Sequence, residues 1–109
     1  MKIVRWVSDA LDVVRAFSPK VRREAGHQLN RVQHAKEPDD WKPMPNIGPG
    51  VNEIRIHAEN EYRIIYIAKF TEAVYVLHAF VKKTQRIPRR DIDLVAKRYR
   101  EIPNLRVKK

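Results

Sequence analysis

The chain has 109 residues, of which 43% are hydrophobic and 33% are charged, so we expect one folded domain over residues 1–109 and not a disordered chain. Its 23 basic and 13 acidic residues give a net charge of +10, which favours a polyanionic partner, a nucleic acid or an acidic protein, over a surface that is merely basic. It has no cysteine, no apolar run that could span a membrane and no N-terminal signal peptide, so we expect a cytoplasmic protein without disulfides or thiolate metal sites.

The N-terminal part is predicted to be a strand followed by a helical hairpin. Residues 2–7 (KIVRWV) alternate as a strand does, and Ser8 is then expected to cap a short helix. Ser18 as N-cap and Pro19 at the first helical position start a second helix. Its apolar stripe consists of Val21, Ala25, Leu29 and Val32.

Residues 36–50 (KEPDDWKPMPNIGPG) are predicted to be irregular, because they hold four prolines and two glycines. Apolar residues in such a loop usually anchor it. We therefore expect Trp41, Met44 and Ile47 to pack back onto the core, and the Gly-Pro-Gly at 48–50 to turn the chain into a sheet.

Two strands follow, over residues 51–57 and 61–70, and the segment AEN between them suits a three-residue hairpin with Asn60 in the left-handed conformation. If residue 57 pairs with residue 61, Arg55 lies directly opposite Arg63. Like charges in that position are destabilising unless an anion lies between them. A register slip of one residue would separate the two arginines.

The next turn, around Thr71 and Glu72, leads into a third strand that begins the segment YVLHAFVKKTQRIP (75–88). The turn is expected to pair Phe70 with Ala73 and so to place Phe80 opposite Arg63. One face of the sheet then carries Arg55, Arg63, His78, Phe80 and Lys82. The other face, expected to pack on the helices, carries Ile54, Ile56, Tyr62, Ile64, Leu77 and Val81. The first set indicates phosphate binding beside an aromatic platform for a base. Taken singly, His78 and Phe80 also suit a core, and the cations suit a solvated surface. Arg55 alone could also pair with Glu53 or Glu72.

The last predicted element is a helix that begins at Pro88, with an apolar stripe of Ile92, Val95, Ala96, Tyr99 and Ile102. Its solvated face is expected to carry Arg89, Arg90, Lys97, Arg98 and Arg100, and a basic tail follows from about residue 104. The whole pattern predicts an α+β fold. It has an N-terminal strand, a helical hairpin, a three-stranded antiparallel meander joined by the first strand, and a C-terminal helix.

Three segments, WKPMPNIGPGVNEIRI, YRIIYIAKF and VYVLHAFVKKTQRIPRRDIDLVAKRY, resemble the phage-derived branch of HigB-like toxins in the RelE/ParE superfamily. The resemblance covers roughly residues 1 to 103. It implies a RelE-like fold and the toxin of a type II toxin–antitoxin pair. Such a toxin is a metal-free endoribonuclease that cleaves mRNA, commonly on the ribosome, and a neighbouring gene encodes its antitoxin, often a helix-turn-helix protein.

The resemblance also implies site residues. The basic positions of RelE-type sites are matched by Arg55, by Arg63 after Tyr62, and by Lys83 beside Lys82, whereas TQRIPRR offers no match for the late tyrosine of RelE. The general base stays open between His78 and a lysine, and His57, at the hairpin tip, ranks lower. The residues expected to bind RNA are Phe80, Thr84, Lys69, Arg89 and Arg90.

No metal or other cofactor is expected, because the four histidines share no ligand spacing with nearby acids. Two alternatives to the ribonuclease stay open. One is a ParE-like toxin that inhibits DNA gyrase without cleaving RNA, which does not require cations converging across a sheet. The other is a basic nucleic-acid-binding domain without catalysis, or a toxin that has become inert.

Overall fold

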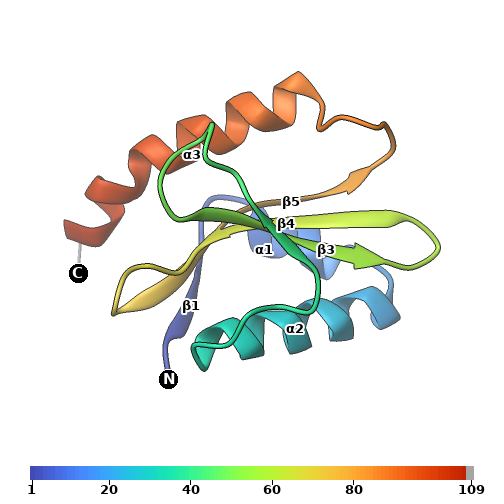
Figure 1. Ribbon diagram of the computed structural model, residues 1–109, viewed down its shortest axis with the longest axis horizontal. Coiled ribbons are helices and arrows are strands. Elements are labelled where there is room, and N and C mark those ends of the chain that lie inside the picture. Colours follow the sequence, from blue (N-terminus) through green and yellow to red (C-terminus); the bar gives the residue numbers. More distant parts are fainter. Residues whose placement is uncertain (108–109) are drawn as a thin grey trace.

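The computed structural model, which describes residues 1–107, is an α+β fold in which three helices cover a five-stranded mixed sheet (Figure 1). In chain order the elements are β1 (Ile3–Trp6), α1 (Ala10–Arg15), α2 (Pro19–Gln33), β2 (Trp41–Pro43), β3 (Val51–His57), β4 (Glu61–Ile67), β5 (Ala73–Lys82) and α3 (Arg89–Val107).

The strand order is β1-β5-β4-β3-β2, with β1 parallel to β5 and the other neighbours antiparallel. The predicted meander of β3, β4 and β5, joined by the first strand, is therefore present. The short edge strand β2 was expected to be irregular, and that prediction is wrong. Its three residues pair with β3, Trp41 opposite Ile54, and its proline is tolerated because it lies on a sheet edge. A strand of three residues is too short to show a period of two in the sequence.

The hairpin between β3 and β4 has the predicted register, with His57 opposite Glu61 and Arg55 opposite Arg63. Its turn has a different backbone from the one expected. In residues 1–107, positive φ angles occur at Ser8, Ala35 and Gly50, so Asn60 is not left-handed. The turn is instead closed by a hydrogen bond of 3.0 Å from the Ala58 N–H to the Asn60 carbonyl.

The pairing of β4 with β5 agrees with the prediction at the site and departs from it beyond a β-bulge. Arg63 lies opposite Phe80 and Ile65 lies opposite His78, but Tyr66 then pairs with Val76, so that Leu77 is an extra residue. Because of this bulge, β4 ends at Ile67 and the pairing of Phe70 with Ala73 does not form. Leu77 packs with the residues under α3 and not, as predicted, on the opposite face.

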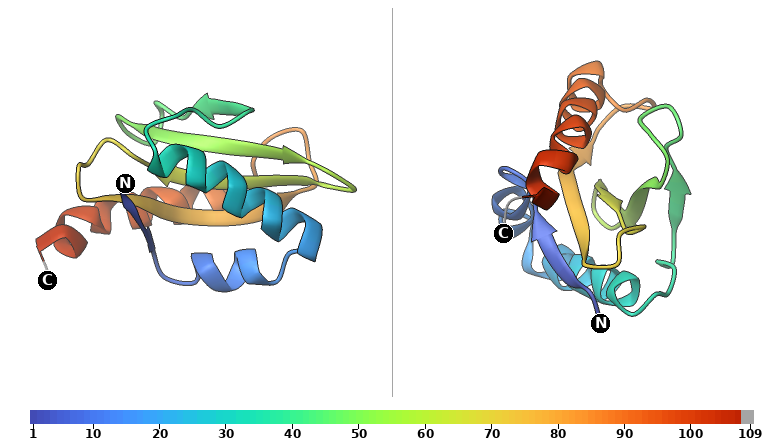
Figure 2. Two further views of the ribbon diagram at one scale, coloured as in Figure 1. Left: turned by 90° about the horizontal axis from the view of Figure 1, so that it is seen from below. Right: turned by 90° about the vertical axis from the view of Figure 1, so that its left-hand side faces the viewer.

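Both faces of the sheet are covered, α1 and α2 lying on one side and α3 on the other (Figures 1 and 2). The first core contains Val21, Ala25, Leu29, Ile54, Ile64 and Val76 among others. The second contains Met44, Ile65, Ile67, Leu77, Phe80, Val95 and Ile102 among others, with Ile47 packed against it. The predicted anchoring of residues Met44 and Ile47 is thus confirmed, while Trp41 lies half-buried in β2.

The two glycines that turn the chain into β3 are required by their surroundings. Gly50 has a φ of +81°, a conformation that other residues rarely adopt. Gly48 lies under the ring of Tyr99, and a Cβ atom there would come within 2.4 Å of that ring. The loop from Met44 to Gly50 is thereby held against α3 (Figure 1).

Of the two predicted N-caps, Ser18 is confirmed and Ser8 is wrong. Ser18 caps α2 as expected, since its hydroxyl accepts a hydrogen bond from the Val21 N–H and Pro19 follows it. Ser8 does not cap α1. It has a φ of 53°, and Asp9 occupies the N-cap position without making a side-chain cap bond.

The buried stripe of α3 is rotated relative to the prediction and consists of Asp91, Val95, Arg98 and Ile102. Arg98, which was expected to be solvated, is 5% exposed. The helix continues through Pro103 to Val107, so the predicted tail is helical up to that residue, and residues 108–109 lie outside the described part. No helix in residues 1–107 is long and apolar enough to cross a membrane.

Candidate functional site

The two central arginines of the candidate site extend from neighbouring strands on the sheet face that α3 partly covers. Arg55 on β3 and Arg63 on β4 are direct cross-strand partners, as the hairpin register requires. Arg63 is 3% exposed, whereas the Arg55 side chain keeps 34% of its surface exposed. One guanidinium is therefore buried in the sheet and the other lies at its margin.

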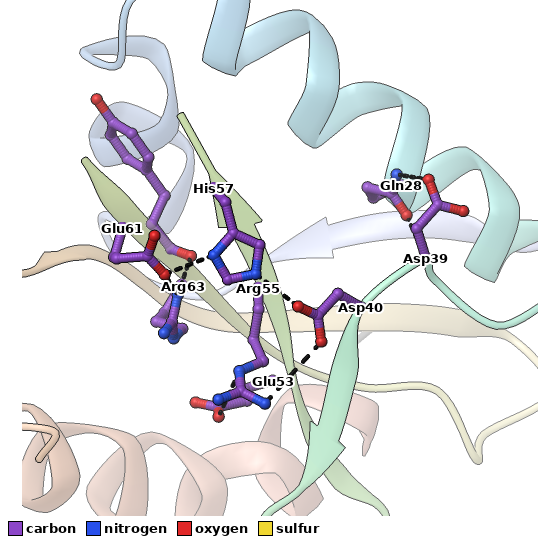
Figure 3. A network of polar contacts seen from close by, with 9 residues as sticks. Gln28, Asp39, Asp40, Glu53, Arg55, His57, Glu61 and Arg63 are labelled. Atoms are coloured by element: carbon purple, nitrogen blue, oxygen red, sulfur yellow. Dashed lines mark hydrogen bonds and ion pairs between the residues drawn. The ribbon is translucent and has the colours of Figure 1, made fainter. Parts of the chain in front are cut away.

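Carboxylates of the protein itself balance these two charges (Figure 3). Arg55 lies 3.9 Å from both Glu53 and Asp40, which are ion pairs too long to be hydrogen bonds. Arg63 donates to Glu61 at 3.3 Å and to the Tyr62 carbonyl at 3.0 Å. The anion that the opposed arginines require is thus supplied, in this structure, by side chains of the same chain.

His57 connects two of these carboxylates at the end of β3. Its Nδ1 lies 2.6 Å from Glu61 and its Nε2 lies 2.6 Å from Asp40, as Figure 3 shows. The hydrogen bond to Asp40, with that to Glu61, raises the pKa of His57 above its ordinary value of 6.5. Because both ring nitrogens face a carboxylate, the doubly protonated imidazolium is the form that this geometry favours.

His78 lies on the same face, on β5, but it is buried. Its Nε2 is 2.7 Å from the Asp91 carboxylate, which belongs to the first turn of α3. Its ring stacks on Phe80 with 5.3 Å between the ring centroids. Phe80 is 8% exposed and packs in the core under α3, so an RNA base can stack on it only after a rearrangement.

The three predicted lysines lie at opposite ends of the sheet. Lys82 ends β5 opposite Glu61, and Lys83 follows it, exposed, at the same end of the sheet as the hairpin tip. Lys69 lies beyond the opposite end of β4, near Phe70, and is not brought together with the other site residues. Lys69 lies six residues beyond Arg63, and at ~3.4 Å per strand residue this separation exceeds the reach of its side chain.

Three further predicted RNA-binding residues lie on the connection from β5 to α3 and in the first turn of the helix. Thr84 is exposed and donates a hydrogen bond to the Arg86 carbonyl. Arg89 and Arg90 are exposed, and Arg89 pairs with Asp93 at 3.1 Å. Asp91 contacts His78 from the same turn, so these two arginines lie near the buried part of the site.

Four buried polar atoms in residues 1–107 have no hydrogen-bond partner, and all four belong to this face of the sheet. They are Glu53 Oε2, Arg55 Nε, Arg63 Nε and His78 Nδ1. Buried polar groups are nearly always paired in native proteins, so a cluster of exceptions is a candidate position for a water molecule, an ion or a polar ligand.

The acidic members of this site were not predicted from the sequence. Glu53 was considered only as one possible ion-pair partner of Arg55, and Asp91 only as an acid that suits the start of a helix. Asp40 lies within residues 36–50, which were predicted to be irregular, directly before β2, and Glu61 opens a strand. A usable signal existed for Glu61, since its predicted position opposite His57 already implied the contact.

A cavity of about 250 Å³ lies beside the site, between α2 and the end of β3 that leads into the hairpin turn. Its lining is of mixed charge and includes Lys20, Glu24, Asp40, Arg55 and His57. In residues 1–107, no group of three or more histidine, aspartate and glutamate side chains is arranged to hold a metal ion.

Comparison with known families gives a match that spans most of the chain. The family described as Phage derived protein Gp49-like (DUF891) matches residues 12–100. No curated protein matches the chain.

Proposed function

The chain belongs to the phage-derived Gp49-like family, which is part of the RelE/HigB-like toxins, and we propose that it is a HigB-like endoribonuclease that cleaves mRNA. In this proposal residues 1–109 form a single toxin domain with RelE-like topology. It is the toxin of a type II toxin–antitoxin system, acts in the cytoplasm on mRNA at the ribosome, and thereby stops translation.

The observation that carries the proposal is the pair of opposed arginines. Arg55 and Arg63 face each other across β3 and β4, and each has a buried Nε–H without a hydrogen-bond partner. Two guanidinium groups in this position suit a phosphate and the charge that develops on a phosphorane. Binding RNA requires that the phosphate replaces Asp40 and Glu61 as the counter-ions of these arginines.

The other site residues have defined roles in this proposal. The reaction needs a base for the ribose 2′-hydroxyl and an acid for the leaving 5′-oxygen, and His78 or a lysine supplies them. Lys82, Lys83 and Thr84, at the end of β5, hold the RNA backbone together with Arg89 and Arg90. Lys69 contacts a more distant part of the RNA. The chemistry uses no cofactor.

A toxin of this family implies an antitoxin partner. The resemblance to HigB-like toxins implies a helix-turn-helix or acidic antitoxin encoded next to the gene, and the net charge of +10 on the toxin favours an acidic binding surface on that partner. One observation favours a non-catalytic nucleic-acid-binding domain as the second candidate. His78 and Phe80 are buried, and carboxylates already occupy both arginines.

The test is induction of the gene in growing bacteria, with mRNA ends mapped by primer extension. The variants are Arg55→Ala and, as a matched control, Arg23→Ala, which removes an exposed cation from α2. We expect wild type and Arg23→Ala to arrest growth and produce new mRNA ends, and Arg55→Ala to do neither. Arrest with intact mRNA favours the gyrase-inhibiting alternative, and no arrest by a folded wild type favours the binding domain.

A further inference from the structure

The buried pair of His78 and Asp91 anchors α3 to β5, and its geometry also suits a second role. The His78 side chain is 8% exposed and the Asp91 side chain 12% exposed, and 2.7 Å separates Nε2 from the carboxylate oxygen. An ionised carboxylate only accepts hydrogen bonds, so Nε2 must carry the proton. In the neutral imidazole, the lone pair is then on Nδ1.

Nδ1 is the atom of this ring that has no partner. It is buried, and no group in residues 1–107 donates to it or accepts from it. The aromatic contact with Phe80, with rings inclined by only 21°, restricts rotation of the imidazole about its own axis. Asp91 and Phe80 together fix both the orientation of the ring and the identity of its basic nitrogen.

The neighbours of His78 are suited to the substrate of the proposed reaction. His78 lies opposite Ile65 on β4, and Arg63 is two residues along the same strand and on the same face. Such diagonal neighbours have Cβ atoms roughly 7–8 Å apart, within reach of long side chains. Both atoms are buried, so the substrate reaches them only after a rearrangement, as for Phe80. The Arg63 Nε–H is then a donor for a phosphate oxygen, and His78 Nδ1 is an acceptor for a hydroxyl group.

We propose that Asp91 is a positioning residue that holds His78 in the Nε2–H form, so that Nδ1 is the general base of the RNA cleavage. The inference rests on the proposed function. Nδ1 takes the proton of the 2′-hydroxyl while the 2′-oxygen forms a bond to phosphorus. The bond from phosphorus to the 5′-oxygen breaks, and that oxygen takes a proton from water. His78 then returns its proton to water, and the products are a 2′,3′-cyclic phosphate and a 5′-hydroxyl end.

The first experiment observes the tautomer and does not depend on RNA. Two-bond ¹H–¹⁵N NMR spectra of the free protein distinguish protonated from unprotonated ring nitrogens, and His78→Gln assigns the signals. We expect the Nε2–H tautomer in the wild type and in Asp91→Glu, and a mixture in Asp91→Ala. An Nδ1–H tautomer in the wild type, or an unchanged tautomer in Asp91→Ala, overturns the positioning role.

The second experiment measures cleavage by the same variants on ribosome-bound mRNA. We expect Asp91→Ala to lower kcat by at least about tenfold with KM changed less than about threefold, and Asp91→Glu to recover much of that loss. Glu101→Ala, which removes an exposed carboxylate ten residues further along α3, is the matched control and keeps wild-type kcat. Thermal unfolding confirms that each variant is folded.

The outcomes separate the two proposals. A changed tautomer in Asp91→Ala with unchanged kcat shows that the pair only anchors α3, and overturns the catalytic inference while the ribonuclease stands. A wild type that has the expected tautomer but cleaves no RNA refutes the ribonuclease and the base together, and leaves Asp91 as the residue that sets the tautomer.

Discussion

At the scale of single residues, the Asp40 carboxylate competes with an RNA phosphate for Arg55. The Asp40 carboxylate lies 3.9 Å from Arg55 and is 42% exposed, so a phosphate must displace it to reach the guanidinium. We expect Asp40→Asn to bind single-stranded RNA about fivefold more tightly, because removal of a screened charge at this distance is worth ~1 kcal/mol. Fluorescence anisotropy with a labelled oligonucleotide measures the affinity, at ~0.15 M salt.

Asp12→Asn is the control for that measurement. Asp12 is exposed on α1, which covers the other face of the sheet, so its removal raises the net charge equally without touching Arg55. Equal gains in affinity for the two variants would show that only overall charge matters and that the arginine pair is not the phosphate site.

His57 gives the fold a dependence on pH. Its pKa is raised above 6.5 in the folded state by its hydrogen bonds to Asp40 and Glu61. Its stabilising contribution is therefore complete below pH 6.5 and is lost as the pH rises through the folded pKa. We expect the stability difference between wild type and His57→Gln to be largest below pH 6.5 and to shrink above it.

Urea unfolding at a series of pH values measures this difference. Repeating the comparison in an Asp40→Asn background removes the larger cause of the shift, so the decline with pH should become smaller there. Parallel stability curves for wild type and His57→Gln across the whole range would contradict the account.

At the scale of elements, the bulge in β5 and the buried face of α3 depend on each other. Leu77 is the extra residue of the bulge, and its carbonyl accepts a hydrogen bond of 2.8 Å from Arg98. Arg98 also pairs with Asp9, ahead of α1, at 2.6 Å. One guanidinium therefore joins α3 to β5 and to the start of α1, and the bulge in turn sets which residues of β5 face the site.

We expect Arg98→Met to lower the free energy of unfolding by about 2–3 kcal/mol, because the buried Leu77 carbonyl loses its donor. Urea denaturation measures the change. Arg100→Met, which replaces an exposed arginine on the same helix, should stay within about 0.5 kcal/mol of the wild type. A similar small effect in both variants would mean that Arg98 does not hold the bulge.

At the scale of the whole molecule, the parts of the fold that could be predicted have a clear signal in the local sequence. The alternation in residues 51–57 and 61–67 determines the hairpin register, and Ser18 with Pro19 marks the start of α2. The bulge at Leu77 could not be predicted, because no glycine or other local signal marks it and it is stabilised by Arg98 from 21 residues away. The buried stripe of α3 was misassigned for the same reason, since two of its members are charged.

The candidate site was also predictable only in part. The shared face of Arg55, Arg63, His78 and Phe80 follows from the register, so the sequence was sufficient to group them. Their burial was not predictable, since it depends on α3 closing over this face. Nor were the counter-ions, because Asp40 and Asp91 reach the site from a loop and a helix whose placement is tertiary.

The proposed ribonuclease activity is tested by incubation of the purified protein with mRNA on ribosomes, followed by analysis of the RNA ends. We expect fragments with 2′,3′-cyclic phosphate and 5′-hydroxyl ends, produced about a hundredfold more slowly by Arg55→Ala and at the wild-type rate by Arg23→Ala. Intact mRNA after incubation with folded wild type, with or without ribosomes, would contradict the proposal and leave a basic domain that binds without cleaving.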